Sequence, residues 1–210
     1  ADLERLASRF KESLNAAGRL VVPGLIDMHV HLREPGFEWK ETVATGVEAA
    51  VLGGFTAVCP MPNTNPVNDS AETTRFILDR GAEAGLARVL PVGAVSQGQK
   101  GEAMAPLSEL AQAGCVAFSD DGRPVHQASL MRRALEWTRM LGLPICCHEE
   151  DSSLAAHGCM NESALSIRLG LRGIPCTAED VMVARDIELA RCTGGSVHVC
   201  HISSARSVEL

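Results

Sequence analysis

Two histidines separated by one residue stand at the end of an apolar run near the start of the chain. His29 and His31 belong to the stretch Asp27–Arg33, which follows a Pro-Gly pair and two apolar residues. Side chains two residues apart in a strand point to the same face, so both histidines are expected to share a face with Asp27 and Arg33. A lone strand histidine is commonly a half-buried core residue. Two imidazoles at one strand end instead favour a divalent-metal site, and imidazole suits zinc.

Other side chains that can bind a metal come directly after later apolar runs. They are Asp120 and Asp121 after Val116–Phe118, His148 after Ile145–Cys147, and His201 after Val197–Cys200. The C-terminal ends of parallel barrel strands converge, so these side chains can meet in one mouth. With the first two histidines they suffice for two zinc ions that share an oxygen ligand, a pair that lowers the pKa of a bridging water and polarises a carbonyl. The two adjacent aspartates precede Gly122 and taken alone would indicate a turn.

Elements of two alternating kinds separate these residues. The predicted strands are Leu20–Leu32, Phe55–Pro60, Arg88–Val95, Cys115–Asp120, Leu143–His148 and Ser196–Ile202. Segments with apolar residues at helical spacing lie between them. These predicted helices are Lys40–Leu52, Ser70–Ala84, Glu102–Ala113, Gln127–Leu141 and Ala178–Cys192. Such alternation is typical of an α/β protein with a parallel sheet.

Six strand–helix units in series, without a sign of reversal, favour a (β/α)8 TIM-like barrel over a doubly wound sheet. Eight units typically need about 250 residues, so we expect this chain to hold an incomplete barrel, with two units beyond its last residue. Residues 18–210 are expected to form that partial barrel, after an N-terminal helical segment over residues 1–17. His201 comes 53 residues after His148. Within that interval, Asp151–Pro175 is predicted to be a long loop over one face.

The composition excludes several classes of partner. The formal charge is −7, from 19 basic and 26 acidic side chains, and no run of lysine or arginine occurs, which argues against nucleic acid or an anionic membrane. No apolar stretch reaches the ~20 residues of a membrane span, and Ala1–Leu20 has no signal-peptide pattern. The eight cysteines form no Cys-X-X-Cys pair and lie largely in apolar runs, so we expect buried thiols in a reducing, cytoplasmic compartment.

Five blocks of residues follow one another in an order that is typical of one family. The blocks are Pro23–Gly36, Met61–Pro66, Phe118–Gly122, His148–Glu150 and His198–Ser203. Together they resemble the signature of dihydroorotases in the amidohydrolase superfamily, and the resemblance runs from about Gly18 to the last residue. Ala1–Asn15 does not resemble the small β domain that normally precedes the barrel of these proteins.

The resemblance implies a role for seven residues. The zinc ligands would be His29 and His31 for the first ion, Asp121 between both ions, and His148 and His201 for the second; Arg33 and Asn63 would bind the carboxylate of the substrate. His198 precedes His201 by three residues, would face the other way on a strand, and is expected to be structural. Many relatives, including hydantoinases, bridge their metals with a carboxylated lysine on the fourth strand. This chain has no lysine there, which favours the aspartate-bridged, bacterial type.

The implied reaction is the zinc-dependent, reversible hydrolysis of dihydroorotate to N-carbamoyl-L-aspartate in pyrimidine biosynthesis. Two alternatives stay open: a hydantoinase or allantoinase, and a non-catalytic dihydroorotase-like subunit that scaffolds aspartate transcarbamoylase. A decayed subunit should have lost metal ligands, whereas all five are present in this sequence. The resemblance also implies a homodimer. It places the catalytic aspartate after the eighth strand, beyond Leu210, so no catalytic residue is expected within the chain and the isolated chain is expected to be nearly inactive.

Overall fold

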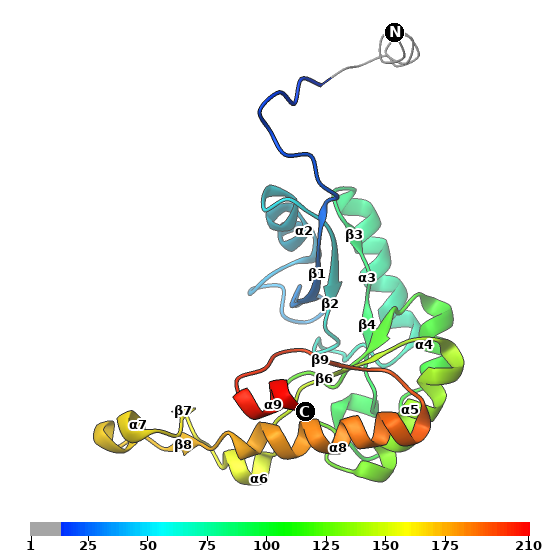
Figure 1. Cartoon of the computed structure of the whole chain (residues 1–210). Helices are drawn as coiled ribbons and strands as arrows, with labels where there is room; N and C mark the ends of the chain where they lie inside the picture. Colours follow the sequence, from blue (N-terminus) through cyan, green and yellow to red (C-terminus); the bar gives the residue numbers. More distant parts are fainter. Residues whose placement is uncertain (1–13) are drawn as a thin grey trace, which may run out of the picture.

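A computed structural model describes residues 14–210, and six parallel strand–helix units organise them (Figure 1). The strands are β1 (Leu25–Val30), β2 (Phe55–Pro60), β3 (Arg88–Val89) with β4 (Val92–Gly93), β5 (Ala117–Phe118), β6 (Ile145–Cys147) and β9 (Val197–Val199). Hydrogen bonds join them in chain order, as β1-β2-β3 and β4-β5-β6-β9, and every pair is parallel. Neighbouring strands in chain order, all parallel, are the topology of a barrel wall, which confirms the predicted fold class.

The third predicted strand is divided into β3 and β4, and each half belongs to a different one of the two hydrogen-bonded sheets. β3 pairs with β2, whereas β4 pairs with β5. Between them, the amide of Leu90 still donates to the carbonyl of Val58 at 2.9 Å, and the carbonyl of Pro91 accepts from Val116 at 3.0 Å. Proline has no N–H to donate, so strand pairing is interrupted at this residue. The curved wall is nevertheless continuous from β1 to β9.

Helices connect the strands and pack against one another in sequence. They are α2 (Val43–Leu52), α3 (Ala71–Ala84), the 3-10 helix η1 (Gln97–Gln99), α4 (Leu107–Ala113), α5 (Ala128–Leu141), α8 (Thr177–Thr193) and α9 (Ala205–Glu209). In Figure 1, α3, α4, α5 and α8 follow one another along the outer side of the wall, and each contacts the next. The predicted helix starts lie within three residues of the observed ones, except that α4 begins at Leu107 and not at Glu102. Ser70, for example, caps α3 by accepting from the amide of Thr73.

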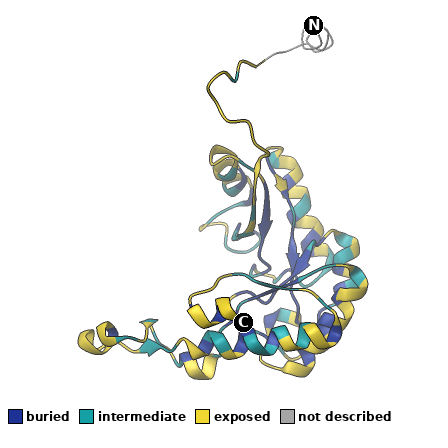
Figure 2. Cartoon of the chain, in the orientation of Figure 1, coloured by how far each residue is buried: buried dark blue, intermediate teal, exposed yellow. Residues whose placement is uncertain are grey.

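Alternate residues of each strand belong to two different cores. Phe118, Ile145 and Cys147 pack with residues of α4 and α5 on the helix-facing side. Ala117 and Cys146 instead form an inner cluster with residues of β2 and β4. Figure 2 shows the buried residues gathered on the strands and on the helix faces that cover them. Because successive side chains of a strand point to opposite faces, this alternation decides which side chains at the strand ends face the barrel mouth and which face the helices.

The segment predicted as a plain loop over one face is folded, so that prediction was wrong. It contains α6 (Ser152–Ala155), β7 (Met160–Asn161), α7 (Ala164–Leu169) and β8 (Gly173–Ile174). β7 pairs with β8 in parallel, and Ser163 and Ser166 form a capping box at the start of α7. In Figure 1 this excursion projects away from the wall at the start of α8.

The first strand is shorter than its apolar run. β1 begins at Leu25 because its hydrogen-bonded partner strand begins opposite it, at Phe55. The residues before Leu25 therefore have no strand to pair with. Most of the helical segment expected over residues 1–17 lies outside the described residues. Within residues 14–210, no helix combines the length and apolar character that crossing a membrane requires.

Candidate metal centre

The two histidines of the first block reach the inner side of the wall through strand alternation. Val30 and Leu32 pack against the helix-facing core of α2 and α3. His29 and His31, which alternate with them, face the opposite side, and both imidazoles are partly buried. The side chain of Asp27 accepts a hydrogen bond from the amide of His29 at 3.1 Å, so it contacts the backbone of the strand.

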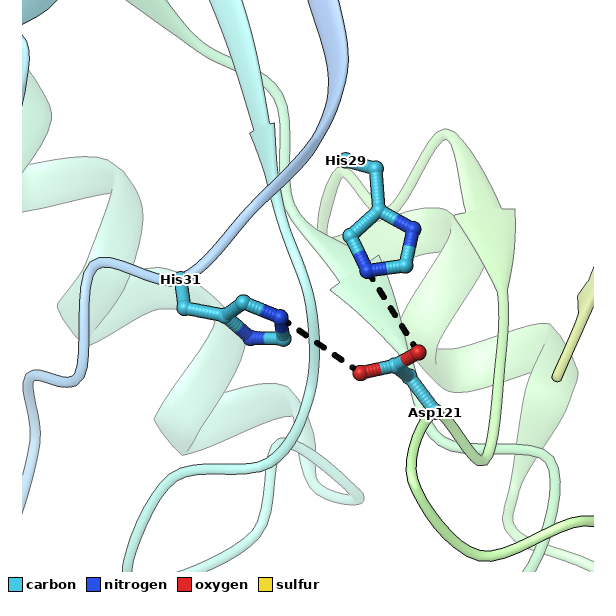
Figure 3. Close-up of side chains that lie close together, drawn as sticks. All are labelled: His29, His31 and Asp121. Atoms are coloured by element: carbon cyan, nitrogen blue, oxygen red, sulfur yellow. Dashed lines mark ion pairs between the residues drawn. The ribbon is translucent and has the colours of Figure 1, made fainter. Parts of the chain in front are cut away.

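All five predicted metal ligands converge at the ends of four strands. Asp121 lies at the centre: its Oδ1 is 3.4 Å from Nε2 of His29 and its Oδ2 is 3.6 Å from Nε2 of His31 (Figure 3). The same Oδ1 is also 3.5 Å from Nδ1 of His148. Nε2 of His201 lies 3.0 Å from that same Nδ1. One carboxylate is therefore common to two groups of potential ligands.

These separations fit metal coordination. Zinc–nitrogen bonds of about 2.1 Å in a tetrahedral arrangement place neighbouring ligand atoms about 3.4 Å apart. The Asp121 oxygens lie 3.4 to 3.6 Å from the imidazole nitrogens of His29, His31 and His148, too long for good hydrogen bonds. Two sets of three donors, one with His29 and His31 and one with His148 and His201, share Asp121. The donor set of imidazole and carboxylate suits zinc, so the residues present fit two such ions.

The charge states also suit a metal. Burial lowers the pKa of His29, and the nearby charge of Asp121 only partly opposes this effect. A neutral imidazole is the form that binds a metal. Burial by itself would raise the pKa of Asp121, but contact with His148 and the charges of His29 and His31 outweigh it, so the pKa lies below its ordinary value. Burial thus favours the neutral imidazole of His29 beside an ionised Asp121 carboxylate.

The neighbouring aspartate is used differently. Asp120 is buried, and its Oδ1 accepts hydrogen bonds from the amides of Val95 and Ser96 at 2.9 and 3.1 Å. The hydroxyl of Ser96 donates to Oδ2 of the same carboxylate. Asp120 therefore holds the segment that follows β4. Of the two adjacent aspartates, only Asp121 lies among the imidazoles.

Asn63, which was expected to bind substrate, contacts two of the candidate ligands. Its Oδ1 lies 3.0 Å from Nδ1 of His31, and its Nδ2 donates to Oδ2 of Asp121 at 3.3 Å. A carbonyl oxygen can only accept, so this contact places the proton of His31 on Nδ1. The lone pair of Nε2 is then directed to Asp121, where a metal would bind. In this arrangement Asn63 orients the ligands.

Arg33 does not continue the strand alternation that the sequence suggested. β1 ends at Val30, and Arg33 has a φ of 62°, in the left-handed region. The strand face that Arg33 was expected to share with Asp27, His29 and His31 was therefore wrong for Arg33, because β1 ends before it. Among the described residues, no carboxylate forms an ion pair with Arg33.

The loop that carries Arg33 is fixed by the residue after it. Glu34 is buried; its Oε2 accepts from the amide of Val43 at the start of α2 at 2.8 Å, and its Oε1 accepts from Nε of Arg80 on α3 at 3.0 Å. No local pattern in the sequence indicates this role, because both partners are distant along the chain. The same loop approaches the one after β2 so closely at Gly36 that a Cβ there would lie 2.0 Å from the carbonyl oxygen of Asn65.

The loop that carries His201 is held from α8. His201 lies beyond the end of β9, and the two carboxylate oxygens of Glu179 accept from the amides of Ser203 and Ser204 at 2.8 and 3.0 Å. Sequence analysis missed Glu179, because an acidic residue in the first turn of a helix is common on electrostatic grounds alone. His198 lies within β9 opposite Cys146 and outside both groups of candidate ligands.

A cavity opens beside the second group of ligands. It has a volume of about 220 Å³ and is bordered by His148 and His201, by Glu150 and Ser203, and by Asn161 and Ile174 of the projecting excursion. The folded excursion therefore contributes to the walls next to the candidate metal centre. A space of this kind can hold part of a small molecule.

Comparison of the sequence with known proteins gives consistent matches. A family model described as dihydro-orotase-like matches residues 18–207. A dihydroorotase of Anaeromyxobacter sp. (strain K) is 60% identical over 201 residues, which are 96% of this chain and 46% of that protein. A dihydroorotase of Desulforapulum autotrophicum is 57% identical over 198 residues, which are 94% of this chain and 46% of that protein. The chain thus spans about half the length of the curated relatives it matches.

Solved structures with a similar fold are more distant in sequence. An L-hydantoinase (dihydropyrimidinase) from Arthrobacter aurescens superposes with a TM-score of 0.72 at 20% identity, over 92% of this chain and 45% of that one. A D-hydantoinase (dihydropyrimidinase) from Thermus sp. gives a TM-score of 0.61 at 23% identity, over 89% of this chain and 43% of that one. These likenesses support the barrel fold.

Proposed function

We propose, from the premise that the chain belongs to the dihydro-orotase-like family, that its protein is a zinc-dependent dihydroorotase. The reaction would be the reversible hydrolysis of dihydroorotate to N-carbamoyl-L-aspartate, a step of pyrimidine biosynthesis. The observation that carries the proposal is Asp121, one carboxylate shared by two groups of imidazoles at distances that fit two metal ions.

In this proposal each residue of the centre has a defined task. His29 and His31 would hold one ion, His148 and His201 the other, and Asp121 both. Zinc, when bound, lowers the pKa of a water ligand and polarises the carbonyl of the scissile amide. Asn63 fixes the tautomer and orientation of His31 through its 3.0 Å contact. The proton transfers of the reaction need a further acid–base residue, which the family resemblance places beyond Leu210.

The substrate class is supported by Arg33. Dihydroorotate carries a carboxylate beside its cyclic amide, whereas hydantoin does not. An arginine fork can bind such a carboxylate with two parallel hydrogen bonds, and no acidic side chain of the described residues neutralises Arg33. The end of the fourth strand carries Ser119, Asp120 and Asp121 and no lysine that could bridge two metals, which also disfavours the hydantoinase alternative. A non-catalytic scaffold would have no need of five converging ligands.

The setting of the enzyme is part of the same proposal. We infer a cytoplasmic protein, because all eight cysteines are free and four of them are buried, a usage that suits a reducing compartment. The family resemblance supports a homodimer, with aspartate transcarbamoylase as a candidate partner.

The proposal is tested by comparing substrates. The full-length product of the gene that encodes this chain, loaded with zinc, should hydrolyse dihydroorotate and form it from N-carbamoyl-L-aspartate. Hydantoin and allantoin should be hydrolysed far more slowly. Equal or faster turnover of hydantoin or allantoin would establish the first alternative. No turnover of any of the three by a protein that holds zinc would favour the scaffold alternative.

A further inference from the structure

A second group of side chains with metal-binding atoms lies on the opposite side of β6 from the histidine–aspartate centre. Cys147 belongs to the helix-facing core, whereas Cys146 belongs to the inner cluster. Glu149 follows Cys147 by two residues, and Asp186 approaches from α8. The donor atoms of Cys147, Glu149 and Asp186 all lie within 4.8 Å of one another. This group, which we call the Cys-Glu-Asp cluster, lies between the end of β6 and α8.

The cluster contains a carboxyl group without a partner. Glu149 is 3% exposed, and neither of its carboxylate oxygens has a hydrogen-bond donor among the described residues. A buried polar group in this state is costly unless a water or an ion satisfies it, and such groups in native proteins commonly mark one of the two. A cavity of about 10 Å³, bordered by all three residues of the cluster, has room for one particle of that size.

The charges of the cluster favour a cation over a water molecule in this cavity. Arg185 forms a two-point ion pair with Asp186, with Nε 2.7 Å from Oδ1 and Nη2 3.0 Å from Oδ2. Its Nη1 donates to the carbonyl of His126, which fixes the guanidinium. With an ion bound, a thiolate and two carboxylates would carry three negative charges, and Arg185 would offset one of them. The remaining two match the charge of one divalent cation.

We propose that Cys147, Glu149 and Asp186 form a further, structural metal site for zinc or another thiophilic divalent ion. The thiolate selects such ions over magnesium and calcium, which prefer oxygen ligands alone. Each carboxylate oxygen of Asp186 keeps a second lone pair after pairing with Arg185, so one of them remains available for the ion. The ion would tie β6 to α8 directly beside His148, and so would hold the backbone that presents this ligand to the barrel mouth.

Cadmium is the probe that separates the two centres. A thiolate bound to cadmium gives a charge-transfer absorption in the ultraviolet, and the histidine–aspartate centre has no sulfur ligand. The titration uses the full-length gene product in which the exposed Cys159, Cys176 and Cys192 are replaced by serine. Cys147→Ala should abolish the band, whereas Cys146→Ala, a change on the same strand but on its inner face, should leave it. His29→Ala should lower the zinc content and also leave the band.

Glu149→Gln tests the proposed metal site even if Cys147→Ala does not fold. Glutamine has the size of glutamate but lacks its negative charge, so the variant should keep the fold. It should weaken cadmium binding to the thiolate by about tenfold or more and remove one zinc per chain. The far-ultraviolet circular dichroism should stay that of the parent protein. An unchanged zinc count and an unchanged cadmium band in Glu149→Gln would overturn the proposal and leave a proton and a water in the cluster. That result would not affect the histidine–aspartate centre, whose ligands are different.

Discussion

At the scale of single residues, the two adjacent aspartates have different tasks: Asp121 is the candidate metal ligand, and Asp120 stabilises the loop after β4. Asp121 faces three imidazoles, whereas Asp120 accepts from two amides and a hydroxyl of the segment after β4. Both are buried, so burial alone does not distinguish them. Their partners do. The sequence identified the pair, but only the family resemblance chose between its members, because the partners of Asp120 lie 24 and 25 residues away.

Asp120→Ala should destabilise the fold and leave metal binding intact in the molecules that remain folded. The change deprives the amides of Val95 and Ser96 of their acceptor, and we expect it to lower the free energy of unfolding by about 2–4 kcal/mol. Urea denaturation followed by circular dichroism measures this loss, with Asp79→Ala, an exposed change on α3, as the control. An unchanged unfolding midpoint together with a lost zinc ion would reverse the roles of the two aspartates.

Arg33→Ala should weaken the binding of substrate without affecting the metals. Loss of a two-point, charge-assisted contact to a carboxylate costs on the order of 2–4 kcal/mol, or ~30–1000-fold in kcat/KM for dihydroorotate. Steady-state kinetics and zinc analysis of the full-length variant check both parts. Were the variant to lose zinc, Arg33 would support the metal centre and not the substrate.

At the scale of elements, acidic side chains join the loops that follow the strands to other segments of the chain. Glu34 ties the loop after β1 to α2 and α3, and Glu179 ties the loop after β9 to α8. Rigid loops keep ligand atoms in register for a metal. Local sequence patterns do not predict these contacts. Glu34 contacts Arg80, and Glu179 contacts Ser203 and Ser204, all of them many residues away in the chain.

Glu179→Ala should weaken the second zinc more than the first. Without its carboxylate the amides of Ser203 and Ser204 lose their acceptor, and the loop with His201 loosens. Losses of this supporting kind typically cost about 10–100-fold in metal affinity. Competition with a chromophoric chelator resolves the two affinities, and Glu188→Ala, an exposed change on the same helix, serves as the control. Equal weakening of both ions would indicate a general loss of structure instead.

Local patterns predicted some elements well and others poorly. The bounds of β2 match the prediction, because its run Phe55–Pro60 is apolar and ends at a proline. The break at Pro91 and the short strands β7 and β8 were missed. Two-residue strands leave no alternation to recognise, and their pairing depends on contacts between distant residues. The convergence of the strand ends was predictable, because it follows from parallel topology.

At the scale of the whole molecule, both ends of the wall have strand edges without a partner in the described residues. β1 pairs only with β2, and β9 only with β6. Leu25, Ile26 and Met28 on β1 are all more than half exposed. An apolar strand with a free edge is a site of association with other chains.

The 210-residue chain on its own should therefore self-associate. Replacing Ile26 and Met28 with lysine should reduce the association, because charged side chains on an edge strand oppose pairing. Sedimentation velocity over a concentration series measures it, and Leu52→Lys on α2, an equally drastic change away from the edge, is the control. A wild-type chain that stays monomeric at every concentration would show that these edges are covered in solution.

Zinc analysis of Asp121→Ala is the decisive measurement for the proposed metal pair. Because one carboxylate would serve two ions, its removal has a consequence that no single-metal site shares. The full-length wild type and the variant are dialysed against the same low concentration of zinc, and the metal content of each is measured. We predict that the variant holds two fewer zinc ions per chain than the wild type. A difference of one ion, or none, would contradict a metal pair built around Asp121.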